Sequence, residues 1–207
     1  ITAKLTANLL EKSGVDRVLA MDLHSAQIQG YFDIPCDHIY GSPVLIDYLE
    51  SLDLEEIVVV SPDVGGVARA RAFAKLMNDA PLAIIDKMRA AHNIAESLTV
   101  IGEVKGKTAI LIDDMIDTGG TICSGANLLK KEGANRIFAC ASHAVFSPPS
   151  YERLSSKNLF EQVIVTNSIP VIHKDNFPQL KVLSVANMLG EAIWRIHEES
   201  SVSSMFR

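Results

Sequence analysis

The sequence predicts an α/β protein with an open, mostly parallel sheet and helices on both faces. The first observation is that strand-like and helix-like segments alternate along the chain, beginning with helical spacing over residues 2–13. The second is that EEIVVVSPD, residues 55–63, contains an apolar run typical of a buried strand. The third is composition: of 207 residues, 48% are hydrophobic and 21% are charged, which is enough for a sizeable core.

The first half of the chain alternates three predicted helices with three predicted strands. Helical spacing ends at Gly14, and the strand-like segment RVLAMDLH follows. Ser42 and Pro43 suit the cap and first turn of the next helix. The strand EEIVVVSPD, the helix VARARAFAKLM and the strand PLAIID come next. Residues 87–97 lack a regular period, so we predict a loop there.

The second half continues the same alternation. TAILIDD is a predicted strand, and the helix over residues 121–131 ends at Gly133. The segments RIFACASH, EQVIVTN and KVLSV are three further predicted strands, followed by a helix over residues 186–197 and a Ser-rich tail. In sheets of this kind ligands bind beyond the carboxyl ends of the strands. We therefore expect functional residues directly after strands.

Composition also narrows the partners. The formal net charge is −6 and no long basic run is present, which argues against nucleic acid as the main partner. No apolar run approaches the roughly 20 residues of a membrane span, and no signal peptide is recognisable, so no membrane partner is expected. Cys36, Cys123 and Cys140 are far apart and form no CxxC pair, which favours a reduced, cytoplasmic setting.

The stretch AILIDDMIDTGGT, residues 109–121, carries three carboxylates and two glycines at the end of a predicted strand. A sharp turn followed by a helix start exposes unpaired N–H groups that, with the helix dipole, hold a phosphate. Glycines permit the backbone angles and the close approach. Carboxylates suit ribose hydroxyls or a phosphate-bridging Mg²⁺. The alternative is an ordinary acidic turn that caps a helix.

This stretch resembles the phosphoribosyl pyrophosphate (PRPP) motif of the type I phosphoribosyltransferase-like fold. MDLHSAQIQGYFDIP, VVVSPDVGGVARARAFAK, AIIDKMR and EAIWRIHEESSVSSMF are similar to segments of bacterial ribose-phosphate pyrophosphokinases. The chain is identified as a member of that family, lacking roughly its first third. The resemblance implies that ribose 5-phosphate is bound by Arg89, Asp113, Asp114, Asp117, Thr118, Gly119, Gly120 and Thr121.

The family's reaction implies transfer of the diphosphoryl group of Mg·ATP to the 1-hydroxyl of ribose 5-phosphate. The products are AMP and PRPP, for nucleotide biosynthesis. The resemblance implies that His24 and Asp63 hold Mg²⁺ and that Lys87 and Arg89 are catalytic cations on a flexible loop. Without the resemblance, His24 could equally be a packed or surface residue, and Lys87 and Arg89 could be a solvated basic pair. The family usually has Arg where this chain has Met88.

The resemblance also implies a domain plan and regulation. Residues 1–41 would be the remnant of an N-terminal domain, 42–185 the C-terminal phosphoribosyltransferase-like domain, and 186–207 a helix and tail that pack back toward the N-terminal domain. We expect apolar faces there without partners. The family forms hexamers, is activated by inorganic phosphate and is inhibited by ADP. The matching positions are Asp33, Ser201, Val202 and Phe206, although composition alone suits a frayed tail.

Two other functions remain open from the sequence. One is a catalytically incompetent fragment or regulatory relative that binds ribose 5-phosphate or PRPP. The other, less consistent with MDLHSAQIQGYF, is a nucleobase phosphoribosyltransferase. Arg69 and Arg71 lie two residues apart on a predicted helix and do not share a face. We assign neither to the site, although one of them could pair with an acid elsewhere.

Overall fold

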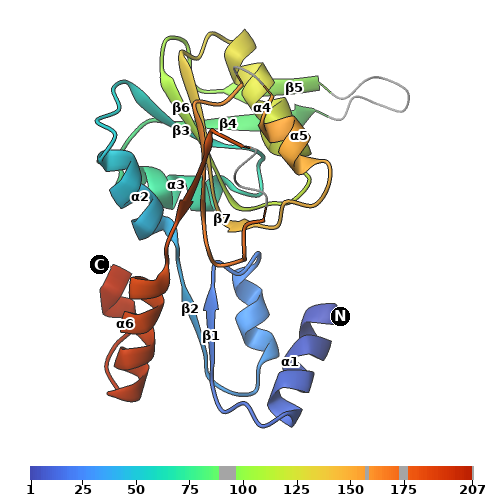
Figure 1. Cartoon of the computed structure of the whole chain (residues 1–207), viewed down its shortest axis with the longest axis vertical. Helices are drawn as coiled ribbons and strands as arrows, with labels where there is room; N and C mark the ends of the chain where they lie inside the picture. The colour runs from blue at the N-terminus through green and yellow to red at the C-terminus, as the bar shows by residue number, and fades with distance from the viewer. Residues whose placement is uncertain (89–96, 157–158, 173–176, 207) are drawn as a thin grey trace. The chain divides into compact units, whose positions relative to one another are not determined.

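The computed structural model describes residues 1–88, 97–156, 159–172 and 177–206, which form two compact units (Figure 1). Unit 1 consists of Ile1–Pro43 and Ser184–Arg207, and unit 2 consists of Val44–Leu183.

Within the described residues, unit 2 contains a seven-stranded sheet in the order β5-β4-β3-β6-β7-β8-β9. All neighbouring strands are parallel except β4 and β5, which are antiparallel at one edge. The strands are β3 (Ile57–Ser61), β4 (Leu82–Met88), β5 (Ser97–Ile101), β6 (Thr108–Ile116), β7 (Arg136–Ala144), β8 (Gln162–Thr166) and β9 (Leu180–Leu183).

Helices cover both faces of this sheet, as Figure 1 shows. One apolar cluster packs α2 (Ser42–Glu50) and α3 (Val67–Leu76) against one face of the central strands. A second cluster packs α4 (Gly120–Lys131) and α5 (Ser150–Leu154) against the other face. Successive residues of β6 alternate between the two clusters, with Ile110 in the first and Leu111 in the second. The predicted fold class, an open and mostly parallel sheet covered on both faces, is therefore confirmed.

The edge hairpin corrects the prediction of a loop over residues 87–97. β4 continues through Met88, and its residue Lys87 lies opposite Leu98 of β5. Antiparallel pairing with β5 holds this segment extended, although its own sequence has no strand-like alternation. The strand β5 was not predicted. Residues 89–96, between the two strands, lie outside the described residues.

Unit 1 is built from α1 (Thr2–Lys12), β1 (Val18–Met21), the 3₁₀ turn η1 (Ala26–Tyr31), β2 (Cys36–Ile39), α6 (Ala186–His197) and the 3₁₀ turn η3 (Ser203–Phe206). β1 and β2 form a parallel pair, with Val18 opposite Cys36. The bounds of α6 are those predicted from helical spacing. β2 was not predicted, because its residues CDHI show no strand-like alternation of apolar and polar side chains.

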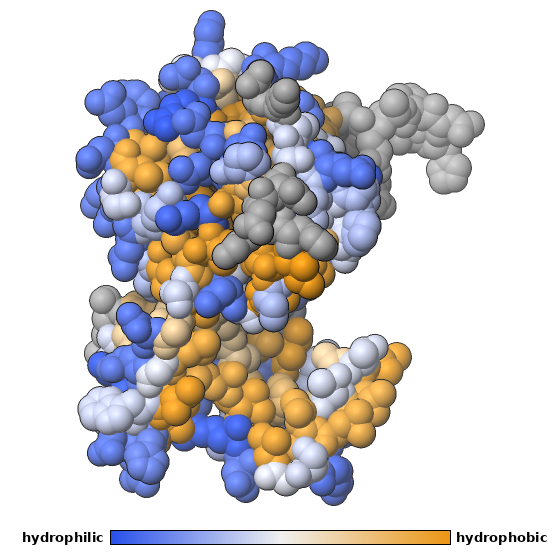
Figure 2. All heavy atoms as spheres, in the orientation of Figure 1, coloured by the Kyte–Doolittle hydropathy of each residue, from blue (hydrophilic) through white to orange (hydrophobic). Residues whose placement is uncertain are grey.

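Unit 1 exposes several large apolar side chains. On α1, Leu5 is 56% exposed and Leu9 is 63% exposed; on α6, Ile193 and Trp194 are exposed to a similar degree. Figure 2 shows the α1 residues as an orange area on the surface. These exposed faces match the expectation of apolar surface without a partner. In the part of the chain that the structure describes, every helix is too short or too polar to cross a lipid bilayer.

Candidate functional site

A tight turn after β6 leads directly into α4. Gly119 has a φ of +72°, in the left-handed region, and a Cβ atom there would lie 3.3 Å from Leu154 Cγ. Glycine is therefore strongly favoured at this turn. α4 begins at Gly120, one residue earlier than predicted, and no side chain of the described residues caps it. Its first N–H groups point out of the helix end, where the dipole favours an anion.

The polar residues of this turn are accessible, and a cation from another element supports it. Asp117, Thr118 and Thr121 are exposed. Arg153 Nη1 on α5 donates a hydrogen bond to the carbonyl oxygen of Thr118 at 3.1 Å. A Cβ atom at Gly120 would lie 3.4 Å from the same nitrogen. Sequence reasoning missed Arg153, because α5 is a five-residue helix that gives no periodic signal.

The acidic pair lies inside β6 rather than after it. β6 pairs with β3 as far as Leu111 but with β7 as far as Ile116. Asp113 and Asp114 therefore occupy the part of β6 that runs past the end of the β3 ladder. Their side chains differ in exposure: Asp113 is 22% exposed and Asp114 is 2% exposed. The Asp113 carboxylate is therefore the more accessible of the two.

Arg69, which sequence reasoning left unassigned, contacts both carboxylates. Its Nη1 atom lies 3.1 Å from Asp113 Oδ1 and 3.1 Å from Asp114 Oδ1. Asp113 Oδ1 also accepts a hydrogen bond from the Asp114 amide at 2.9 Å. Burial and the neighbouring Asp114 carboxyl raise the pKa of Asp113 to about 7, while the positive charge of Arg69 opposes this change. The Asp113–Asp114 doublet is therefore a partly buried acidic site whose carboxylates are both paired with Arg69.

The loop after β3 positions the second acidic candidate. Asp63 Oδ1 accepts a hydrogen bond from the Gly66 amide at 2.8 Å, and Ser61 Oγ donates to the Asp63 carbonyl at 2.7 Å. A Cβ atom at Gly66 would lie 2.9 Å from Ser61 Oγ, so the loop has no room for a side chain there. Asp63 is exposed at the amino end of α3. The loop therefore presents one oriented carboxylate.

The chemistry of Asp63 fits a magnesium ion. Its Oδ2 atom has no hydrogen-bond partner among the described residues, and an exposed carboxylate oxygen is a ligand type that Mg²⁺ uses. The described residues contain no group of three His, Cys, Asp or Glu side chains that could hold a metal. Mg²⁺ does not need such a cage, because it keeps waters and shares substrate phosphates.

In unit 1, His24 is exposed in the segment between β1 and η1. The backbone around it is tied to β2 and the residues after it. The Leu23 amide donates a hydrogen bond to His38 Nε2 at 3.0 Å, and Asp22 Oδ2 accepts one from the Gly41 amide at 2.7 Å. His24 is thus carried on an anchored segment. It belongs to unit 1, whereas Asp63 belongs to unit 2.

Asp33, a candidate regulatory residue, lies on the surface beside α1. Its Oδ2 atom pairs with Lys4 Nζ at 3.3 Å, and its amide donates to Glu11 Oε1 at 2.7 Å. The carboxylate is 80% exposed, so this ion pair contributes little to stability.

The tail residues dock on unit 1 rather than fray. Arg195 Nη1 on α6 donates to the carbonyl oxygen of Ser201 at 3.1 Å. The carbonyl oxygen of Val202, just before η3, accepts a hydrogen bond from the Met205 amide at 3.1 Å, and the ring of Phe206 meets that of Tyr40 edge-on at 6.0 Å.

The two candidate catalytic cations are not both described. Lys87 is exposed near the end of β4, on a strand rather than in the predicted loop. Arg89 lies outside the described residues, so its position is not assigned.

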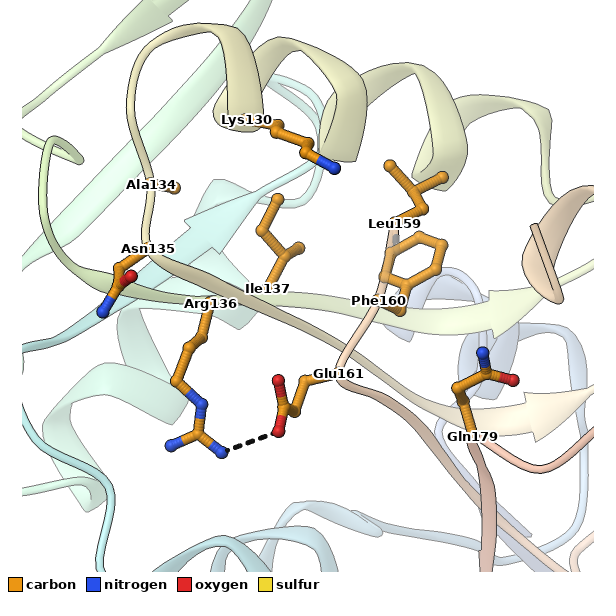
Figure 3. A pocket seen from close by; sticks show the side chains of 9 residues that line it. All are labelled: Lys130, Ala134, Asn135, Arg136, Ile137, Leu159, Phe160, Glu161 and Gln179. Atoms are coloured by element: carbon orange, nitrogen blue, oxygen red, sulfur yellow. Dashed lines mark hydrogen bonds and ion pairs between the residues drawn. The ribbon is translucent and has the colours of Figure 1, made fainter. Parts of the chain in front are cut away.

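A hollow of about 290 Å³ lies at the opposite end of the strands (Figure 3). Arg136 opens β7 there and pairs with Glu161 at 3.2 Å, while Gln179 comes just before β9. The rest of its lining is Lys130, Ala134, Asn135, Ile137, Leu159 and Phe160. None of the candidate residues lines it. Asp63, Lys87 and the Asp113–Asp114 doublet lie at or near the carboxyl ends of their strands instead.

Comparison with known proteins identifies the family of the chain. The phosphoribosyl synthetase-associated domain matches residues 77–207, more than half of the chain. A ribose-phosphate pyrophosphokinase of Prochlorococcus marinus subsp. pastoris is 95% identical over the whole chain, which covers 62% of that protein. Ribose-phosphate pyrophosphokinase 1 of spinach, Spinacia oleracea, is 64% identical, with the same coverage. The chain therefore spans about 62% of the length of these relatives.

A solved structure supports the same relationship. The crystal structure of phosphoribosylpyrophosphate synthetase from Mycobacterium smegmatis is 44% identical in sequence and aligns with a TM-score of 0.88. The alignment covers 96% of this chain and 64% of that one.

Proposed function

We propose that this chain, which belongs to the ribose-phosphate pyrophosphokinase (phosphoribosyl synthetase) family, is part of an enzyme that makes PRPP. The enzyme transfers the diphosphoryl group of Mg·ATP to the 1-hydroxyl of ribose 5-phosphate and releases AMP, for nucleotide biosynthesis. The observation that carries the proposal is the path from the Asp113–Asp114 doublet through the left-handed Gly119 into the uncapped start of α4. It combines acceptors for hydroxyls with donors for a phosphate.

The sugar phosphate would bind along this path. The 5-phosphate accepts hydrogen bonds from the first amides of α4, beginning with Gly120, and from the hydroxyls of Thr118 and Thr121. Asp113 and Asp114 accept hydrogen bonds from the 2- and 3-hydroxyls of the ribose. This arrangement orients the 1-hydroxyl as the nucleophile. Asp117, exposed in the same turn, completes the polar rim of the subsite.

Diphosphoryl transfer requires alignment and neutralisation of phosphate charge. Asp63 would hold Mg²⁺, which when bound neutralises charge on the phosphates of ATP. The magnesium role of His24 rests on the family pattern alone. Lys87 and Arg89 would stabilise the negative charge that develops on the transferred group. Lys87 is supported by its exposure near the end of β4; Arg89 rests on the family pattern alone.

The proposal extends to the regulation, assembly and cellular location of the enzyme. We propose activation by inorganic phosphate and inhibition by ADP through Asp33, Ser201, Val202 and Phe206, supported by the docked tail. Assembly as a homo-oligomer, a hexamer in the family, is supported by the exposed apolar residues of α1 and α6. A cytoplasmic setting is supported by Cys36, Cys123 and Cys140, none of which forms a disulfide.

The test is an assay of AMP release by the whole protein with Mg·ATP, with and without ribose 5-phosphate. We expect AMP to form only when the sugar phosphate is present. Calorimetric titration with ribose 5-phosphate alone should give a saturable binding curve. Binding without AMP formation would indicate the regulatory or binding-only relative instead, and absence of both would refute the proposal.

A further inference from the structure

Arg69 on α3 is paired with the two acidic residues of β6. It is the third residue of α3, and its single Nη1 atom contacts Asp113 Oδ1 and Asp114 Oδ1, both at 3.1 Å. The first turn of a helix disfavours a cation, because the dipole is positive there. The first turn of α3 itself holds no acidic residue, and Asp63, just before it, accepts a hydrogen bond from the Gly66 amide. The carboxylates of β6 therefore supply the favourable partner for this guanidinium.

The doublet in turn depends on a cation. Two carboxyls on consecutive residues repel each other, and both are largely withdrawn from water, with exposures of 22% and 2%. Arg69 and Asp114 are the charged groups that act on Asp113 among the described residues. With Arg69 removed, Asp113 would keep its proton to a higher pH, and the pair would present two charged acceptors over a narrower pH range.

The contact also fixes orientation. Asp113 Oδ1 accepts from both Arg69 Nη1 and the Asp114 amide, so its carboxylate plane is held by two donors. A bound ribose presents two neighbouring hydroxyls at a fixed spacing, and acceptors held at matching positions bind them best.

We propose that Arg69 is a positioning residue of the ribose subsite. It holds the carboxylates of Asp113 and Asp114 together, charged and oriented, so that they accept the 2- and 3-hydroxyls of a ribose 5-phosphate. This role rests on the proposed function of the site. It assigns recognition of the hydroxyls, and not of the phosphate, to the contact between α3 and β6.

The test separates the hydroxyls from the phosphate. In the whole protein, Arg69→Met is compared with Arg71→Met, a matched control two residues further along α3 with an exposed side chain. Each variant is titrated with ribose 5-phosphate and with 2-deoxyribose 5-phosphate. For Arg69→Met we expect ribose 5-phosphate binding to weaken by about ten- to hundredfold, as for a lost charged interaction. Binding of the 2-deoxy compound should weaken less, so the preference for ribose shrinks.

A second readout is the pH profile. Arg69→Met should move the pH above which ribose 5-phosphate binds to a higher value, because Asp113 loses the cation that favours its charged form. Arg71→Met should leave both the preference and the profile unchanged. If Arg69→Met does not fold, Arg69→Lys is titrated with the same two ligands. Lys keeps the positive charge but lacks the guanidinium group that contacts both carboxylates.

The outcomes are distinguishable. If the Arg69 variant binds ribose 5-phosphate and the 2-deoxy compound more weakly by the same factor, the role of Arg69 is structural and the inference is overturned. Unchanged binding of both compounds would also overturn it. A wild-type protein that does not bind ribose 5-phosphate at all would refute the proposed function itself. If the wild-type protein binds ribose 5-phosphate more tightly than the 2-deoxy compound, and the Arg69 variant shows the same two affinities, the inference alone would be refuted.

Discussion

Asp113→Asn should stabilise the fold near pH 8 while removing ribose 5-phosphate binding. Asn has nearly the same shape as Asp but carries no charge. In the folded chain the pKa of Asp113 is raised from 3.8 to about 7, chiefly by burial and next by the Asp114 carboxyl. The folded state therefore bears a free-energy cost for the charged form of Asp113, and the substitution removes that cost.

The sign and size follow from proton linkage. Below about pH 4 the carboxyl is protonated in both folded and unfolded chains, so it contributes no difference. As pH rises from about 4 to 7, the unfolded chain loses the proton while the folded chain retains it, and stability falls. The two pKa values differ by about three, which corresponds to about 4 kcal/mol at about 1.36 kcal/mol per unit. This is an upper limit, because Asp113 is 22% exposed and water solvates part of its charge.

The assay is urea unfolding of wild type and Asp113→Asn at several pH values between 4.5 and 8. We expect the two free energies of unfolding to be similar at the acidic end and to diverge toward pH 8, with the variant more stable. Asp117→Asn is the matched control, because Asp117 is exposed in the turn that follows the same strand. A variant that follows the wild-type pH dependence, or that is less stable at pH 8, would refute the assignment of a costly buried charge.

The same titration predicts the binding behaviour. A charged Asp113 accepts hydrogen bonds from ribose hydroxyls, whereas a protonated carboxyl offers one acceptor fewer. Ribose 5-phosphate should therefore bind more tightly as pH rises through about 7, the range over which the ligand-free fold loses stability. Site function and fold stability thus oppose each other at this residue.

Four further predictions concern the rest of the site. Gly120→Val should preserve the fold but abolish ribose 5-phosphate binding in calorimetry, because its methyl groups would fill the phosphate position; Ser124→Val, exposed further along α4, is the control. Arg153→Met should weaken ribose 5-phosphate binding, since Arg153 holds the Thr118 carbonyl of the turn; unchanged affinity would argue against this support. Lys87→Ala should lower turnover by orders of magnitude with little change in KM, as expected for a contact made in the transition state; a rise in KM alone would make it a substrate anchor. Removing residues 200–207 should weaken ADP inhibition more than basal activity in steady-state assays, and equal loss of both would indicate a purely structural tail.

Local pattern predicted the long elements of the chain. The helices α1, α3, α4 and α6 and the central strands β3, β6, β7 and β8 fall close to their predicted ranges. Each is long or apolar enough that its buried residues recur in the sequence with a helix-like or strand-like spacing. The strands β2 and β5 and the helix α5 were missed; they have four or five residues each and, unlike the equally short β1 and β9, no apolar run marks them. Such short segments adopt their structure through pairing or packing with distant partners, as β5 does with β4.

The sequence by itself determined which residue types meet at the end of β6 and the start of α4. The consecutive aspartates, the turn glycine and the helix start are local features of neighbouring residues. Only the tertiary structure decided how those residues are held. Arg69 meets Asp113 across 44 positions, and Arg153 meets Thr118 across 35. The physical reason is that a charge pair depends on distance in space, which is set when α3 and α5 pack on opposite faces of the sheet. Burial of Asp114 and the raised pKa of Asp113 arise in the same way, because desolvation exists only once the chain has folded around them.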